Sequence, residues 1–276
     1  MTKRPRSGST AFRPVEATLL TNSIRAELEW AGTYGDLKTN GSASQKKNFA
    51  EILSRALAQR FADALRGTFP AILPNPDGTG QESKARTGKG LKRLDVNYST
   101  NELGLGLGVS IKTINFRDAR SKRYTKNYTR ADNEFRAEAA DYHQRQPYSV
   151  LCAIFFLPLD SCDDGGGNDP SSFGHAVRIF RFRAGRRLPT DDPALFESFL
   201  IGLYSTDPAQ FGAVAFFDVM EAPPKYGRPN ELLRFEQCVE RIRDVYDRRN
   251  STTFVWADAP VEEAIGIITE DDLSDE

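Results

Sequence analysis

The residue types best suited to chemistry gather between Asp95 and Lys112, in the segment LDVNYSTNELGLGLGVSIK. Read as a β-strand, this segment from Leu103 onward places its glycines, Ser110 and Lys112 on one face. Three glycines on one face predict that something approaches the backbone closely there. A lysine at the end of that face, with a carboxylate on the preceding strand, suits a metal-assisted site that handles phosphate. The opposite face is aliphatic and is expected in the core: Leu103, Leu105, Leu107, Val109 and Ile111.

Common phosphate-binding and catalytic motifs do not account for this segment. The run LGLGLGV is not a G-x-G-x-x-G loop, because Val109 stands where the last glycine belongs. TGKG is not a Walker loop, because Gly90 replaces its Ser or Thr. His143 and His175 are too few for a histidine-rich metal site and are interpreted as structural hydrogen-bonding residues. There is also no G-x-S-x-G nucleophile elbow.

The elements that must position Asp95 and Lys112 follow from hydrophobic spacing and from Gly and Pro punctuation. Ser44 is expected to cap a long helix, and a loop is expected over 70–90. The apolar run YSVLCAIFFLPL is typical of a strand buried on both faces. The complete prediction is helices over 15–30, 44–66, 130–144, 171–180, 192–204 and 230–249, and strands over 91–99, 103–116, 148–159 and 212–219.

Strands and helices alternate without an obvious linker, which predicts a single α/β domain with helices on both sides of a mixed sheet. We expect this domain over 14–257. Residues 1–13 are predicted to form a flexible basic arm, and 258–276 an acidic C-terminal tail with eight acids and no bases. That tail is interpreted as a solubilising end, with shielding of a basic surface as the alternative.

Composition is that of a soluble globular chain, with 39% hydrophobic and 27% charged residues. No apolar run approaches the ~18–20 residues of a membrane span, and no apolar segment of a secretory signal follows the basic N-terminus. Cys152, Cys162 and Cys238 show no paired spacing. They are interpreted as reduced thiols of a cytoplasmic protein, with Cys152 in the core.

The net charge of −1 hides a strong segregation along the chain. Between Lys84 and Arg130 there are twelve Lys or Arg residues against only three acids. This basic block brackets the strands that carry Asp95 and Lys112, which favours a polyanion partner over an ordinary solvated face.

Asp95, followed after fourteen residues by Ser110-Ile111-Lys112, resembles the PD-(D/E)xK nuclease superfamily. The signature of that family is an Asp on one strand and (E/D)-x-K on the next. A helix precedes these strands, and another helix and a buried strand follow. The elements expected over about 44–160 come in that order. The resemblance implies an α/β fold with a restriction-endonuclease-like mixed central sheet flanked by helices.

Two positions depart from the family's signature. Leu94 stands in place of the proline, and Ser110 in place of the acidic residue of (E/D)-x-K. A hydroxyl is a poor substitute for a carboxylate on a hard divalent ion. A subgroup of restriction enzymes has S-x-K and takes its second acid from the following helix, where this chain offers Glu134 and Glu138 on one face. Alternatively, these acids form exposed pairs with Arg130 or nearby bases.

The resemblance implies phosphodiester hydrolysis by a Mg²⁺-dependent DNA endonuclease, with Mn²⁺ as an alternative ion. Asp95, the relocated glutamate and the carbonyl of Ile111 would hold the ion. Lys112 would orient the water nucleophile and neutralise charge that develops on the scissile phosphate. Glu51, on the inward side of the preceding helix, is interpreted either as a water-mediated contact to the site or as a capping or surface residue.

Double-stranded DNA is the partner that this resemblance implies, bound by a homodimer if the analogy with many such enzymes holds. The implied enzyme is a prokaryotic restriction-like or anti-phage nuclease. Two alternatives stay open: a nucleic-acid-binding module that lost catalysis with the change at Ser110, and a nuclease subunit activated by a partner or small messenger. The expected phosphate, backbone or base contacts are Arg117, Arg120, Lys122, Arg123, Tyr124, Lys126, Asn127, Arg130 and Arg136.

Overall fold

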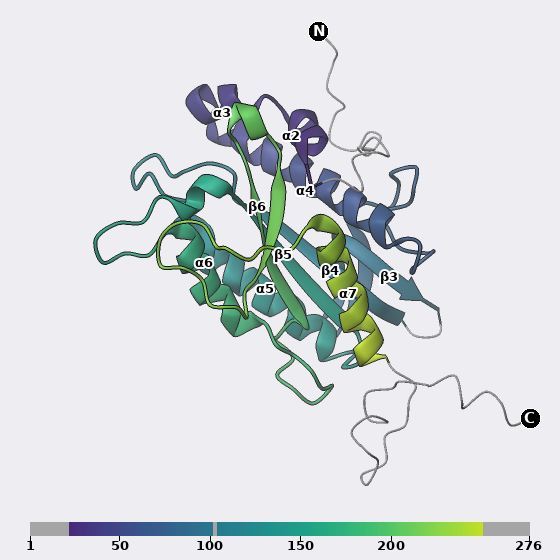
Figure 1. Cartoon of the computed structure of the whole chain (residues 1–276). Coiled ribbons are helices and arrows are strands. Elements are labelled where there is room, and N and C mark those ends of the chain that lie inside the picture. The colour runs from purple at the N-terminus through teal and green to yellow at the C-terminus, as the bar shows by residue number, and fades with distance from the viewer. Residues whose placement is uncertain (1–21, 102–103, 251–276) are drawn as a thin grey trace, which may run out of the picture.

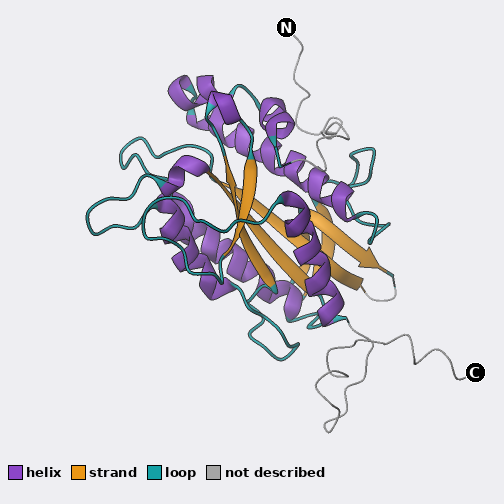
Figure 2. Ribbon diagram, in the orientation of Figure 1, coloured by secondary structure: helices purple, strands orange, loops and turns teal. Residues whose placement is uncertain are grey.

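The structure is a computed structural model that describes residues 22–101 and 104–250. Within those ranges, no helix is long and apolar enough to cross a membrane. Helices and strands alternate through most of the chain (Figures 1 and 2). Their bounds are α2 Arg25–Ala31, α3 Tyr34–Asn40, α4 Ala43–Leu65, β1 Ser83–Thr87, β2 Gly90–Leu94, β3 Val96–Thr100, β4 Gly104–Thr113, α5 Tyr128–His143, β5 Val150–Pro158, α6 Ser172–Phe180, β6 Ser198–Tyr204, β7 Val214–Asp218 and α7 Phe235–Arg249.

A five-stranded mixed sheet with the order β3-β4-β5-β6-β7 forms the centre of the molecule. The strands β4, β5 and β6 are parallel, whereas β3 and β7 pair antiparallel at the two edges. A separate antiparallel pair, β1 with β2, packs beside this sheet. The prediction of a mixed α/β architecture is therefore confirmed.

Helices cover both faces of the central sheet (Figure 2). Apolar residues of α2, α3, α4 and α7 share one buried cluster with one face of the strands. Those of α5 and α6 share a second cluster with the opposite face. Strand β5 is buried along its whole length, because its side chains alternate between the two clusters. This arrangement of a sheet between two layers of helices positions α4 and α5 on opposite sides of β4.

The alternation predicted for β4 holds for part of its length. Leu107, Val109 and Ile111 lie in the cluster under α4, as expected. Leu105 instead lies in the cluster on the α5 side. The register between β3 and β4 shifts at Tyr98. A bulge of this kind adds a residue and reverses the facing of what precedes it, so the prediction for Leu105 was wrong.

Local signals explain where the helices flanking β4 begin. The hydroxyl of Ser42 accepts a hydrogen bond from the backbone of Gln45, whose side chain bonds back to Ser42. This capping box starts α4 two residues before the predicted cap at Ser44. The helix predicted over 130–144 is confirmed as α5, and that predicted from 171 as α6, capped by Ser171.

Three predicted elements were wrong. Residues 192–204 were expected to be helical, but this segment contains β6, whose seven residues are all buried. A fully buried apolar run has no polar face to reveal its period, so a strand and a helix cannot be separated by spacing there. The predicted loop over 70–90 contains β1, and the predicted strand over 91–99 is divided at Asp95 between two sheets.

Several predictions concern residues outside the described ranges. The basic arm over 1–13, the acidic tail over 258–276 and the first part of the helix predicted over 15–30 are among them, as is Leu103. The three cysteines lie within the described ranges, and all are buried and free. Cys152 is in the core as predicted.

Candidate active site

A cleft of about 440 Å³ opens at the C-terminal end of β4, between α4 and α5. Asp95 and Lys112 both line it, together with Glu51 from α4 and Glu134 from α5. Asp95 occupies the single position between β2 and β3, where the chain passes from the two-stranded to the five-stranded sheet. The structure thus brings together the two groups on which the sequence-based hypothesis depends.

The Asp95 carboxylate is fixed to the neighbouring strand. Its Oδ2 accepts a hydrogen bond of 2.7 Å from the backbone N–H of Ile111. Burial raises the pKa of Asp95 to about 7; the Ile111 hydrogen bond and the Lys112 charge oppose this rise, and the Glu138 charge adds to it. Without a bound cation, Asp95 therefore exchanges its proton near neutral pH.

Ser110 is joined to α5 through Glu138. The hydroxyl of Ser110, itself buried, donates a hydrogen bond to Oε1 of Glu138. Burial raises the pKa of Glu138, against the lowering effects of the Lys112 charge and the Ser110 hydrogen bond. The serine that replaces the signature's acid thus holds an acid from the next helix beside it, and Glu138 is the glutamate nearest that missing carboxylate.

Lys112 lies between Glu134 and an aromatic ring. Its Nζ is 3.2 Å from Oε2 of Glu134 and 5.1 Å from the centre of the Phe135 ring. Glu134 also accepts a 2.7 Å hydrogen bond from Arg130. Burial disfavours the charged form of Glu134, but its bonds with Arg130 and Lys112 outweigh this and hold its pKa below the ordinary value. Glu134 therefore forms the predicted pair with Arg130 and also anchors Lys112.

Glu51 lines the cleft from the side of α4, but it is exposed and forms an i,i+4 ion pair with Lys47 at 3.6 Å. Two cleft residues that sequence analysis missed, Arg55 and Glu82, form an ion pair at 3.0 Å. Glu82 has a positive φ of 50° and also bonds Arg93. Residues 27 positions apart carry no local pattern, so no sequence signal could have paired them.

Side chains of the protein itself approach the glycines of β4. A Cβ at Gly108 would lie 2.8 Å from Leu151 Cδ2 and 3.1 Å from Leu94 Cδ1, and one at Gly106 would lie 3.1 Å from Tyr98 Cδ1. The expectation of a close approach is thus met by core packing. These glycines give no support to a ligand on that stretch of backbone.

The donors around the cleft suit Mg²⁺ in kind, because carboxylate and carbonyl oxygens are its preferred ligands. Asp95 and Glu138 are two carboxyl groups whose pKa values burial has raised, and a divalent cation would relieve that cost. Within the described ranges, no group of three or more His, Cys, Asp or Glu side chains is arranged to hold a metal ion. Of the residues expected to hold the ion, Asp95 and Ile111 line the cleft, whereas Glu138 is not among its lining residues and is hydrogen-bonded to Ser110.

The residues expected to contact DNA divide into two groups. Arg117, Arg123 and Lys126 are engaged within the protein, by Asp160 at 3.0 Å, by Asp164 and Asp169, and by Asp118 at 2.7 Å, respectively. Tyr124 is buried and bonds Asp160. The second group is exposed and consists of Arg120, Lys122, Asn127, Arg130 and Arg136, of which Arg130 is also paired with Glu134. Lys126 of the first group is exposed as well.

Of the exposed group, Asn127 and Arg130 line the cleft. Arg136 lies two residues from Glu134, about 200° around α5, so it faces away from the cleft. The cleft itself is balanced in charge, with Lys47, Arg55, Lys112 and Arg130 facing Glu51, Glu82, Asp95 and Glu134. The basic block of the sequence therefore does not make the cleft lining basic, because the cleft also contains four acids.

Comparison of the chain with protein-family models, with curated proteins and with solved structures gives no match.

Proposed function

We propose that this protein is a Mg²⁺-dependent DNA endonuclease related to the PD-(D/E)xK superfamily. One observation carries the proposal: Asp95 and Lys112 line one cleft, and Ser110 holds Glu138 beside them. The order α4, β3, β4, α5, β5 agrees with that expected of the family and supports the assignment. Within that superfamily, we propose a prokaryotic restriction-like or anti-phage enzyme. It would act in the cytoplasm on double-stranded DNA.

The side chains would divide the reaction among them. Asp95, Glu138 and the carbonyl of Ile111 would bind the cation. Bound Mg²⁺ would supply a hydroxide equivalent near neutral pH and charge for the phosphate oxygens. Lys112, anchored by Glu134, would orient the attacking water and stabilise the negative charge that develops on the scissile phosphate. Ser110 is a positioning residue, because it acts through Glu138.

The burial of Asp95 and Glu138 gives the proposed site a built-in pH dependence. Both carboxyls must lose their protons before they can hold a cation, and the pKa of Asp95 is about 7. Cation binding should therefore strengthen as the pH rises from about 6 to 8.

A digest tests the proposal directly. Purified protein is incubated with mixed phage genomes and with methylated and unmethylated plasmids, in Mg²⁺, Mn²⁺ or EDTA, and the new DNA ends are sequenced. The proposal expects metal-dependent cleavage with ends of one chemical polarity. Retarded migration of DNA in Mg²⁺ and Mn²⁺ without cleavage of any substrate would indicate a binding module instead.

A further inference from the structure

A second concave site lies at the opposite end of the sheet from the candidate active site. Its cavity of about 480 Å³ is lined by residues of the loop before β6 and by the last three turns of α7. Glu197, at its base, directly precedes β6, whereas Lys112 lies near the C-terminal end of β4. Because β4, β5 and β6 are parallel, the two sites occupy opposite ends of these strands. Five arginines line the cavity: Arg186, Arg187, Arg241, Arg248 and Arg249.

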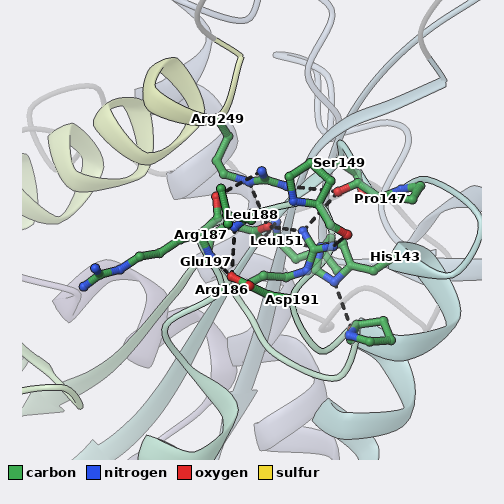
Figure 3. Close-up of polar contacts among 12 residues, drawn as sticks. His143, Pro147, Ser149, Leu151, Arg186, Arg187, Leu188, Asp191, Glu197 and Arg249 are labelled. Carbon is green, nitrogen blue, oxygen red and sulfur yellow. Dashed lines mark hydrogen bonds and ion pairs between the residues drawn. The ribbon is translucent and has the colours of Figure 1, made fainter. Parts of the chain in front are cut away.

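Two of these arginines are locked in place by Glu197 (Figure 3). Its carboxylate lies 3.0 Å from Arg186 and 3.3 Å from Arg249, and it also accepts the backbone N–H of Leu151 at 2.8 Å. Both guanidinium groups donate to the carbonyl of Pro147. This buried network fixes the floor of the cavity, since each partner restrains the others.

The floor keeps unused hydrogen-bonding capacity. The side chain of Arg186 is 1% exposed, and its Nε has no hydrogen-bond partner within the described ranges. A buried donor without an acceptor is costly.

The remaining three arginines are exposed, and they differ in how the protein itself engages them. The side chain of Arg187 extends away from the Glu197 network in Figure 3, and its guanidinium has no recorded partner in the part of the chain that the structure describes. Arg248 donates to a carbonyl of its own helix, that of Asp244, at 3.2 Å. Arg241 pairs with Asp218 at 2.7 Å.

The charge and the walls of the cavity indicate the class of ligand. Glu197, Asp218 and Asp191, the last of which interacts with the charges of Arg186 and Arg249, oppose the five arginines, so the cavity keeps a net positive charge that suits a ligand with phosphate groups. Guanidinium groups bind phosphate oxygens bidentately. Beside them lie two apolar side chains, Val245 and Met220, the latter 51% exposed. The volume lies in the range of pockets for small organic ligands.

We propose that this arginine-lined cavity binds a nucleotide, with its phosphates on Arg187 and Arg248 and its base on Met220 and Val245. A single phosphate would leave the apolar wall unused, and an apolar ligand would leave the guanidinium groups unpaired. This inference goes beyond the proposed nuclease function and does not depend on it, because neither Asp95 nor Lys112 contributes to the cavity.

Calorimetric titration of the full-length protein tests this assignment. ATP, ADP and pyrophosphate are added in EDTA, so that the candidate metal site stays empty. The variant Arg187→Ala/Arg248→Ala removes two exposed guanidiniums, and Arg145→Ala/Arg178→Ala is the matched control, since both residues are exposed and lie outside the cavity. Thermal melts verify that each variant remains folded.

The proposal expects one saturable site for ATP and weaker binding of pyrophosphate, which lacks a base. Affinity for ATP should fall at least tenfold in Arg187→Ala/Arg248→Ala and stay within twofold in the control. Absence of saturable binding by all three probes, or an equal loss in the control, would overturn the assignment. Displacement of ATP by a short DNA duplex would also overturn it, because the cavity would then belong to a nucleic-acid surface.

Discussion

Asp95 is a carboxyl group with a pKa of about 7 in a setting that includes Glu138, Lys112 and Glu82. Its ordinary value is 3.8, so the folded state binds a proton that the unfolded state releases between those two pH values. In the absence of divalent cations, the contribution of Asp95 to the free energy of unfolding should therefore be most favourable below about pH 4. It should decrease as the pH rises to 7.

The variant Asp95→Asn should remove this pH dependence, because it keeps the shape of the side chain without the charge. At pH 8 in EDTA, its free energy of unfolding should exceed that of the wild type by on the order of 1–3 kcal/mol. The difference should vanish at pH 4. Urea denaturation at both pH values checks it, with the exposed Asp247→Asn as control. If the free energies of unfolding of the wild type and Asp95→Asn changed equally with pH, burial would not raise the pKa of this carboxyl.

Glu134 and Glu138 should differ in their importance for catalysis. Glu138→Gln should raise the Mg²⁺ concentration needed for half-maximal cleavage on the order of 100-fold. Ser110→Ala should raise it about tenfold, because the serine orients that glutamate. Glu134→Gln should cost only a few-fold, since Glu134 is engaged by Lys112 and Arg130. Metal titrations of the cleavage rate measure all three. A larger loss in Glu134→Gln than in Glu138→Gln would reverse the assignment.

The sequence could narrow the relocated acid to two residues but could not choose between them. Glu134 and Glu138 are four apart and share one face of α5. Which glutamate lies beside Ser110 depends on the position of α5 along β4. The packing of the buried Phe135 and Ala139 against the sheet determines that position. The spacing of residues along the chain does not encode this position.

At the scale of elements, β4 is shaped by glycines that make room for its neighbours. Gly108→Ala should destabilise the fold by about 1–3 kcal/mol, because the new methyl would collide with Leu151 and Leu94. Gly35→Ala should be neutral or stabilising, since this glycine lies in α3 with nothing within 4 Å of the added carbon. Chemical denaturation of both variants checks the contrast, and an unaffected Gly108→Ala would contradict the packing account.

The sequence distinguished helix from strand where periodicity or a capping residue marked the element. The distinction failed where burial on both faces left no polar positions. The predictions for α5, α6 and β5 held, because polar faces, a capping serine or a flanking proline marked them. Strand β6 was mistaken for a helix because burial on both faces leaves no polar stripe. The bulge at Gly106, opposite Tyr98, escaped prediction because a glycine-rich strand tolerates several registers.

At the scale of the whole molecule, the basic block of the sequence does not become an equally basic surface. Acids from other elements neutralise it, including Asp141, which pairs with Lys89 at 2.9 Å and Lys92 at 2.8 Å. Conversely, the five arginines of the second cavity come from two segments, 186–187 and 241–249, that are more than fifty positions apart. Net charge along a segment is therefore a weak guide to the field that a partner meets.

Arg120 and Arg123 should respond differently to replacement. Arg120→Ala should reduce the slope of log affinity for DNA against log salt by about one unit, because an exposed arginine acts on phosphate alone. Arg123→Ala should instead lower thermal stability, because its guanidinium bonds the carbonyl of Pro170 and lies near Asp164. Salt titrations of DNA binding and thermal melts separate the two effects. A stability loss in Arg120→Ala with no change of slope would contradict this division.

In the proposed reaction, the ammonium group of Lys112 acts on a scissile phosphate beside a cation that Asp95 would hold. The most direct test of this role is to measure cleavage and DNA binding side by side in Lys112→Ala and Lys47→Ala, two lysines of the same cleft. We expect Lys112→Ala to lower the cleavage rate on the order of 1,000-fold. Its affinity for DNA should stay within about threefold of wild type. Lys47→Ala should cleave normally. Wild-type cleavage by Lys112→Ala, or an equal loss in Lys47→Ala, would contradict this role.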